Sequence, residues 1–127
     1  MKQGIADTSV FVAQETGRDL GELPEKIAVS VITAAELELG VLRASDTETR
    51  ARRLATLSRV RSAYRLLPID EKTSSCFARI AAQELDAGRK LRIHDAWIAA
   101  TALRYGVSVV TQDADFSAFS SVTVVRV

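Results

Sequence analysis

Short apolar runs alternate with longer amphipathic segments along the chain. Apolar runs at residues 4–6, 27–29, 107–111 and 122–127 predict β-strands, and a shorter run at 66–69 predicts an edge strand. Apolar positions at helical spacing predict helices over residues 8–14, 31–44, 46–65, 71–87 and 94–105. Strands joined by helical crossovers favour parallel pairing. The pattern therefore predicts one α/β domain over residues 1–127, with a mostly parallel central sheet and helices on both faces.

Several helix boundaries carry residues that are typical of caps. Thr8 and Ser9 are expected to cap the first helix, Ser30 the second, and Asp46 the long third helix, because these side chains accept hydrogen bonds from free amides. Gly106 is expected to end the helix over residues 94–105. These local signals support the order of elements given above.

The composition of the chain excludes several classes of protein but does not point to one function. The 127 residues are 47% hydrophobic and 26% charged, with a formal net charge of +1, which argues against disorder and against an obligate polyanion binder. Cys76 is the only cysteine, so an intrachain disulfide and a thiolate-only zinc site are excluded. A single thiol fits a reducing compartment, and we expect a cytoplasmic protein. No apolar run approaches the roughly 18 residues of a membrane span.

Three aspartates stand at positions of chemical interest. Asp7 and Asp113 each follow a predicted strand, and the carboxyl ends of parallel strands share one edge of the sheet, where ligands bind. Each could equally be a turn or capping residue. Asp95 falls within an apolar stripe of its helix, where a carboxylate needs a proton, a hydrogen-bond donor or a cation, unless it caps the helix start.

Glu36 is not selected by periodicity. On its helix it shares a polar stripe with Thr33, Gly40 and Arg43, which is typical of a solvated glutamate. Its interest comes from a resemblance to a known family.

Four short motifs carry that resemblance, in order along the chain. They are residues 5–9 (IADTS), 33–37 (TAAEL), 94–102 (HDAWIAATA) and 110–116 (VTQDADF). Together they resemble the PIN domain, and in particular the VapC toxins of bacterial toxin–antitoxin pairs. The resemblance covers essentially the whole chain.

The resemblance implies a set of functional residues. The acidic quartet would be Asp7, Glu36, Asp95 and Asp113. Either Thr8 or Ser9 would lie beside a bound metal ion. Asp115 is also acidic, and only the spacing from Thr111 favours Asp113 over it.

Converging carboxylates need a cation. Two of them about 4 Å apart repel by roughly 4 kcal/mol at an effective dielectric of 20. Oxygen ligands without a cysteine or histidine motif suit Mg²⁺, or Mn²⁺, better than zinc. We therefore expect a metal-activated water that attacks a phosphodiester, which the resemblance implies to be that of RNA, with Asp7, Asp95 and Asp113 as ligands and Glu36 as a further ligand or water-positioning group.

The family likeness also implies partners: an RNA substrate, a cognate antitoxin that occupies the acidic pocket, and a second copy in a homodimer. Two alternatives stay open, namely another metal-dependent phosphoesterase and a catalytically silent binding partner. Ser9 stands where phosphatases that form an aspartyl phosphate carry a second aspartate, which argues against that class.

Basic residues gather in two stretches. The first comprises Arg43, Arg50, Arg52, Arg53, Arg59, Arg61 and Arg65, and the second Arg89, Lys90 and Arg92. Both could bind the RNA backbone, or the first could be an ordinary solvated helix face.

Three single residues outside these stretches also have candidate roles. His94 is a candidate general acid or a plain surface imidazole. Trp97, opposite Asp95 on its helix, is expected to pack against another element or a second subunit, and Cys76 to lie in the core.

Overall fold

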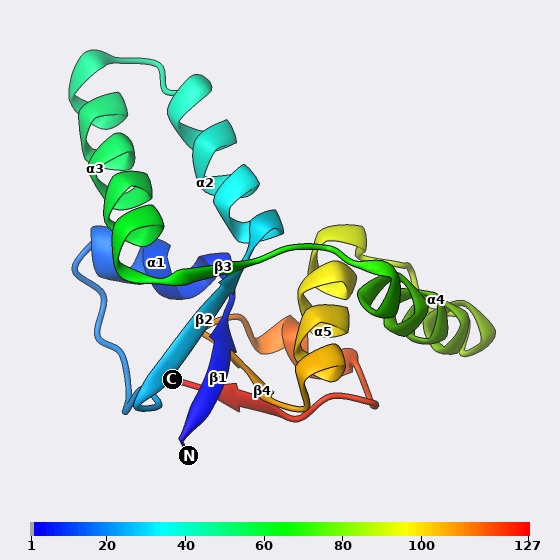
Figure 1. Ribbon diagram of the computed structural model, residues 1–127. Helices are drawn as coiled ribbons and strands as arrows, with labels where there is room; N and C mark the ends of the chain where they lie inside the picture. Colours follow the sequence, from blue (N-terminus) through cyan, green and yellow to red (C-terminus); the bar gives the residue numbers. More distant parts are fainter. Residues whose placement is uncertain (1) are drawn as a thin grey trace.

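Parallel strands form the centre of the protein, as the computed structural model in Figure 1 shows. The structure describes residues 2–127. Within them the strands are β1 (Gln3–Ala6), β2 (Lys26–Ser30), β3 (Arg65–Leu67), β4 (Ser108–Thr111) and β5 (Val124–Arg126). Their order is β3-β2-β1-β4-β5, and every pair is parallel. The predicted parallel sheet is confirmed, and so is the edge position of β3.

Helices cover both faces of this sheet, as predicted (Figure 1). They are α1 (Thr8–Glu15), α2 (Val31–Leu42), α3 (Thr47–Ala63), α4 (Glu71–Asp86) and α5 (Ile93–Tyr105), with a short 3₁₀ helix η1 (Ala114–Ala118). Helices α1, α2 and α3 pack on one face, and α4 and α5 on the other. Among residues 2–127, no helix is long and apolar enough to cross a membrane.

Alternate strand residues feed two separate cores. Ile5 and Val109 are fully buried against α4 and α5, whereas their neighbours Ala6 and Val110 are fully buried against α1, α2 and α3. Successive side chains of a strand point to opposite faces, so a strand covered on both faces must be apolar throughout. This requirement explains why short uninterrupted apolar runs located the strands.

The helix starts confirm two predicted caps and correct one. Ser30 accepts from the amide of Ile32 at 3.0 Å, and Asp46 accepts from the amide of Thr49 at 2.8 Å. The prediction that Thr8 and Ser9 cap α1 was wrong, because Asp7 is the N-cap residue. Asp7 is extended at the end of β1, so its carboxylate reaches the Ser9 amide at 3.1 Å.

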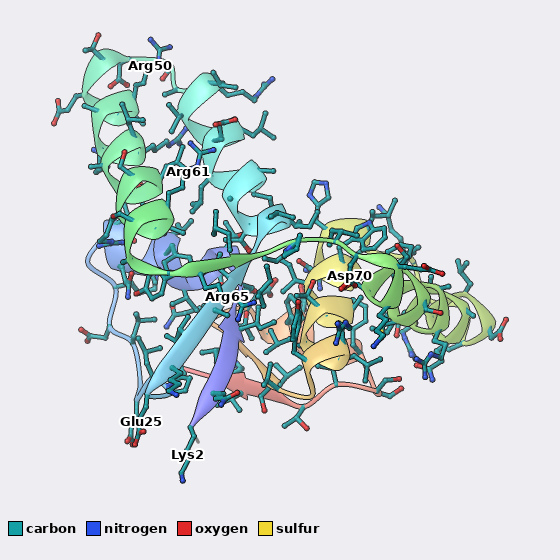
Figure 2. The ribbon with its side chains drawn as sticks, viewed as in Figure 1. Lys2, Glu25, Arg50, Arg61, Arg65 and Asp70 are labelled. Atoms are coloured by element: carbon teal, nitrogen blue, oxygen red, sulfur yellow. The ribbon has the colours of Figure 1, made fainter. Side chains whose placement is uncertain are left out.

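Two arginines of the first basic stretch fasten α3 to the end of α2. Arg50 donates to the carbonyl of Ala44 at 3.0 Å, and Arg53 donates to that of Gly40 at 2.8 Å. Figure 2 shows Arg50 at the tip of the hairpin that the two helices form. Carbonyls in the last turn of a helix lack partners within it, so Arg53 satisfies one in α2, and Arg50 satisfies one that follows the helix.

The packing of α4 against α5 confirms two further predictions. The rings of Trp97 and Phe77 stack with their centroids 3.9 Å apart, so Trp97 packs against another element of the same chain. Cys76 is buried in the adjoining core.

Candidate metal and RNA site

The acidic residues selected from the sequence lie at the carboxyl-terminal edge of the sheet. Asp7 directly follows β1, Asp113 follows β4, and Glu36 lies on α2, the helix that begins where β2 ends. Asp95 is in the first turn of α5, which packs against β1 and β4. Parallel topology brings these distant segments to one edge, where α/β sheets bind their ligands.

Asp7 is held rigidly by hydroxyl groups. It is only 4% exposed, its Oδ1 accepts from the Ser9 hydroxyl at 2.6 Å, and its Oδ2 accepts from the Thr111 hydroxyl at 2.6 Å. Burial raises the pKa of Asp7, while the hydrogen bonds from Ser9 and Thr111 oppose that rise. The nearby charge of Asp113 raises this pKa further.

Glu36 is half-buried and faces the same site. The Thr8 hydroxyl donates to its Oε1 at 2.7 Å, and Nδ1 of His94 lies 3.5 Å from its Oε2. Glu36 and Asp95 line a depression of about 400 Å³ whose other walls are residues 91–94. The polar stripe of α2 is therefore turned toward the start of α5, which helical periodicity alone cannot reveal.

The pKa of Asp95 is affected by the charges of the other three carboxylates. Its pKa is raised to about 6, first by burial and then by the negative charges of Asp7, Glu36 and Asp113. Only Arg92 works in the opposite direction among these causes. Asp95 does not cap α5, because the N-cap residue is Arg92. The carboxylates thus share one electrostatic environment.

Arg92 lies between two of these carboxylates. Its Nη2 is 2.5 Å from Oδ2 of Asp95 and 3.0 Å from Oδ2 of Asp113. The pKa of Asp113 is lowered, chiefly because it accepts the amide of Asp115 and also because of Arg92. The sequence placed Arg92 only within a basic cluster. Its spacing of three residues before Asp95 was the one available signal for a direct pairing.

Of the two acidic residues in the last motif, Asp113 is the one turned toward the site. Asp115 is exposed, and its amide donates to Oδ1 of Asp113 at 2.9 Å. The other oxygen of Asp113 contacts Arg92, which also contacts Asp95.

Much of the arginine-rich α3 is engaged within the protein. Besides Arg50 and Arg53, Arg61 pairs with Glu38 at 2.8 Å and Arg59 donates to Gln14 at 3.1 Å. In the second basic stretch, Arg89 makes two hydrogen bonds, of 2.7 and 2.9 Å, to the buried Glu84. A basic sequence is therefore a poor guide to a free basic surface here.

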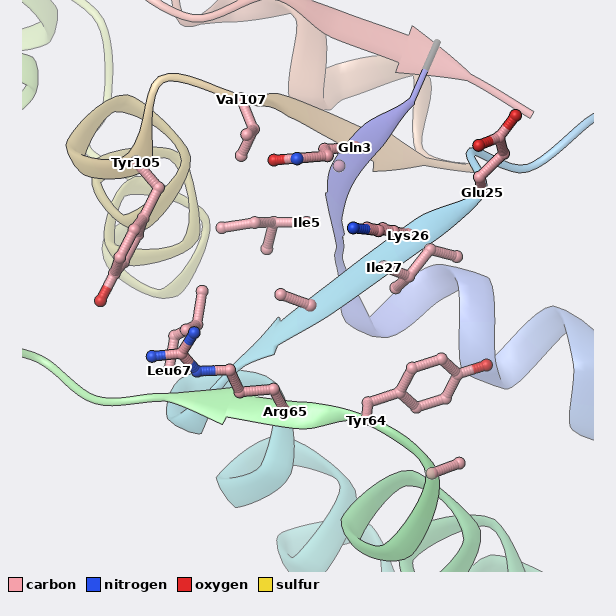
Figure 3. Close-up of a pocket in the computed structure, with 13 residues that line it drawn as sticks. Gln3, Ile5, Glu25, Lys26, Ile27, Tyr64, Arg65, Leu67, Tyr105 and Val107 are labelled. Carbon is pink, nitrogen blue, oxygen red and sulfur yellow. The ribbon is translucent and has the colours of Figure 1, made fainter.

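A larger hollow, of about 540 Å³, lies at the opposite end of the sheet. Figure 3 shows it between Tyr64 and Arg65 on one side and Tyr105 on the other, near the starts of the strands. The acidic quartet does not line this hollow, whose apolar floor includes Ile5 and Leu67. Size alone therefore does not identify the reactive site.

The donor set fits a hard divalent cation. It consists of carboxylate and hydroxyl oxygens, which suit Mg²⁺ or Mn²⁺, and burial together with mutual repulsion disfavours the ionised form of Asp95 unless a cation is present. Among the described residues, no three carboxylate, imidazole or thiol groups already enclose one ion position. The guanidinium of Arg92 supplies the positive charge between Asp95 and Asp113.

Comparison with known proteins gives consistent similarities. The family model described as PIN domain matches residues 5–121. Ribonuclease VapC5 of Mycobacterium tuberculosis is 45% identical over 129 aligned residues, which cover 98% of this chain and 95% of the relative. Ribonuclease VapC4 of the same organism is 39% identical over 132 aligned residues, which cover 100% of this chain and 98% of the relative. The crystal structure of VapBC-5, from the VapBC family of toxin–antitoxin systems of M. tuberculosis, matches with a TM-score of 0.91 and 42% identity over 100% of both chains.

Proposed function

This chain belongs to the PIN domain family, in its VapC branch, and on that premise we propose that it is a Mg²⁺-dependent endoribonuclease, the toxin of a toxin–antitoxin pair. The observation that carries the proposal is the gathering of four carboxylates from separate segments at one edge of the sheet: Asp7, Glu36, Asp95 and Asp113. Asp95 and Asp113 meet at Arg92, and Glu36 and Asp95 line one depression. Mn²⁺ has the same ligand preference and would replace Mg²⁺.

Each carboxylate would have a distinct part. The bound ion would supply a water activated for attack and would offset negative charge on the RNA phosphate. Asp7, fixed by Ser9 and Thr111, would be the rigid ligand. Asp113, whose pKa is lowered, and Asp95, whose pKa is raised to about 6, would complete the ligand set.

Glu36 would have a different part, because its second oxygen lies beside His94, whereas Asp95 and Asp113 meet at Arg92. Its Oε1 accepts from Thr8, which fixes the side chain, and Oε2 faces the depression near His94. This geometry supports a role in orienting the attacking water or in holding a second ion.

We propose an antitoxin and a second copy of this chain as protein partners. The antitoxin would cover the acidic depression and exclude the ion or the RNA. Leu39 and Leu42 on α2, the helix of Glu36, are 52% and 71% exposed, which supports a partner surface beside the site. A homodimer is to be tested by light scattering. The single, buried thiol is consistent with work in the reducing cytoplasm.

RNA cleavage with and without the metal tests this function. Purified protein is incubated with total RNA in Mg²⁺ or in EDTA, as the parent chain and as Asp7→Asn. Asparagine is also a good N-cap residue, so α1 should remain capped. The matched control is Asp86→Asn, at the exposed end of α4.

The parent and Asp86→Asn should cut RNA in Mg²⁺ and lose that activity in EDTA, while folded Asp7→Asn should be inactive in both. Cleavage of RNA by Asp7→Asn at the parent rate would contradict the assignment of the active site to these carboxylates. A folded parent that cuts no RNA with any divalent ion would favour the silent binding partner, and cleavage of another phosphoester alone would favour a different phosphoesterase.

A further inference from the structure

We propose that Arg92 is a built-in counter-cation of the acidic site, which competes with the divalent ion for Asp95 and Asp113 and must leave them before the ion binds. The inference rests on the proposed metal-dependent function and deepens it. It makes Arg92 a positioning residue that couples metal binding to substrate binding.

The first argument is the place of the guanidinium group. A single nitrogen of Arg92 contacts Oδ2 of Asp95 at 2.5 Å and Oδ2 of Asp113 at 3.0 Å. These two carboxylates come from different elements, α5 and the turn after β4, so the nitrogen lies where their outward oxygens converge. A divalent ion that used both residues as ligands would need those oxygens.

The second argument is that the two cations exclude each other. Mg²⁺ binds oxygens at about 2.0–2.1 Å and demands near-octahedral geometry. If Asp95 bound the ion through Oδ2 while keeping its contact with Arg92, a cation of charge +2 and a guanidinium of charge +1 would lie within about 5 Å of each other in a partly buried site. The site therefore favours one occupant at a time between Asp95 and Asp113.

The third argument is that the side chain can move while the backbone stays. The carbonyl of Arg92 accepts from the amide of Ala96 at 2.8 Å, which anchors the residue at the start of α5. Its side chain is 37% exposed, and it makes no capping bond to the helix. Leaving the carboxylates would thus cost the guanidinium its ion pairs but would not unwind α5.

The displaced group would remain at the edge of the substrate site. Arg92, Glu36 and His94 line the same depression, so a freed guanidinium would face an RNA backbone bound there. Guanidinium groups bind phosphate through two parallel hydrogen bonds. Metal binding would then free the guanidinium of Arg92 to bind a phosphate of the RNA. By linkage, bound RNA would increase the affinity for the metal by the same factor by which the metal increases the affinity for RNA.

Calorimetric titration of Mn²⁺ tests the competition. The variants are Arg92→Gln and, as a control for the loss of one positive charge in the same loop, Lys90→Gln. Lys90 is exposed, and no salt bridge to it is found in residues 2–127. Arg92→Gln should bind Mn²⁺ roughly 5- to 100-fold more tightly than the parent. Lys90→Gln should stay within about twofold of the parent, because an exposed charge is screened.

A second readout follows the guanidinium itself. In the NMR spectrum in EDTA, the ¹⁵N-bound protons of the Arg92 guanidinium should give separate signals, because the two ion pairs slow their exchange with water. Saturating Mg²⁺ should return them to the averaged signal of a free arginine. If these signals do not change at saturation, or if Arg92→Gln binds Mn²⁺ no better than Lys90→Gln, Arg92 is a fixed structural bridge. If the parent and both variants bind no Mn²⁺, the metal-dependent function itself fails.

Discussion

Thr111 donates its hydroxyl proton to Oδ2 of Asp7 at 2.6 Å, although 104 positions separate the two residues in the chain. The same hydroxyl oxygen accepts from the amide of Asp113 at 2.9 Å. One buried side chain at the end of β4 therefore sets the orientation of a carboxylate after β1 and of the turn that carries another.

Replacement of Thr111 by valine, which has the same shape, should reduce both stability and activity. Asp7 would lose a donor in a buried site, so the free energy of unfolding at pH 7 should fall by roughly 1–3 kcal/mol. Urea denaturation measures this loss. Thr123→Val, at an exposed position, is the control and should change little. Equal stability of the two variants would mean that the Thr111 hydrogen bond contributes nothing.

Removing the charge of Glu36 should lower the pKa of Asp95. The negative charge of Glu36 raises that pKa, and Glu36→Gln keeps an oxygen to accept from Thr8. Carboxyl-carbon NMR titration of metal-free protein measures the shift. The control is Glu38→Gln, two residues further along α2, where the side chain is exposed and paired with Arg61. An Asp95 pKa that is the same in Glu36→Gln and the parent would show that the two carboxylates do not interact.

Asp95 should destabilise the metal-free protein at neutral pH. Its pKa is about 6 in the folded chain against 3.8 for an ordinary aspartate, so the folded state holds its proton more tightly than the unfolded state. The contribution of this group to stability is therefore full below pH about 4 and is lost as pH rises through 6. In EDTA at pH 7.5, Asp95→Asn should be more stable than the parent by roughly 1–3 kcal/mol.

This advantage should shrink as pH falls toward 4, where Asp95 is protonated in the parent as well. Chemical denaturation across pH 4–8 follows it. A parent that is more stable than Asp95→Asn throughout that range would contradict the assigned burial and repulsion. Adding Mg²⁺ should stabilise the parent and not the variant, because only the parent retains the Asp95 carboxylate as a ligand for the ion.

Arg53 should matter for stability and not for catalysis. It donates to the Gly40 carbonyl at 2.8 Å, so Arg53→Met should lower the free energy of unfolding by roughly 1–2 kcal/mol and leave the rate of RNA cleavage unchanged. Arg43→Met, at an exposed position after α2, is the matched control for stability. A large loss of cleavage by folded Arg53→Met would instead place RNA on α3.

The fold was predictable because its signals are local. A strand buried on both faces has to be apolar throughout, as Ile5 and Ala6 show, and Ser30 and Asp46 lie next to the amides that they cap. The cap of α1 was assigned to the wrong residues because Asp7 both ends a strand and faces the site.

The direction of Glu36 and the partners of Arg92 depend on tertiary structure. Periodicity shows which residues share a stripe of α2, and not that this stripe faces α5. Likewise, the pairing of Arg92 with Asp95 follows from helical spacing, but its contact with Asp113, 21 residues away, requires the folded sheet.

The most direct test of the central claim is paramagnetic broadening of side-chain carboxyl signals by substoichiometric Mn²⁺. Signals of the quartet should broaden first and together: Asp7, Glu36, Asp95 and Asp113. Those of Glu38 and Asp86 should broaden far less. Broadening centred on other carboxylates, or none at concentrations that support RNA cleavage, would contradict a single metal site built from these four residues.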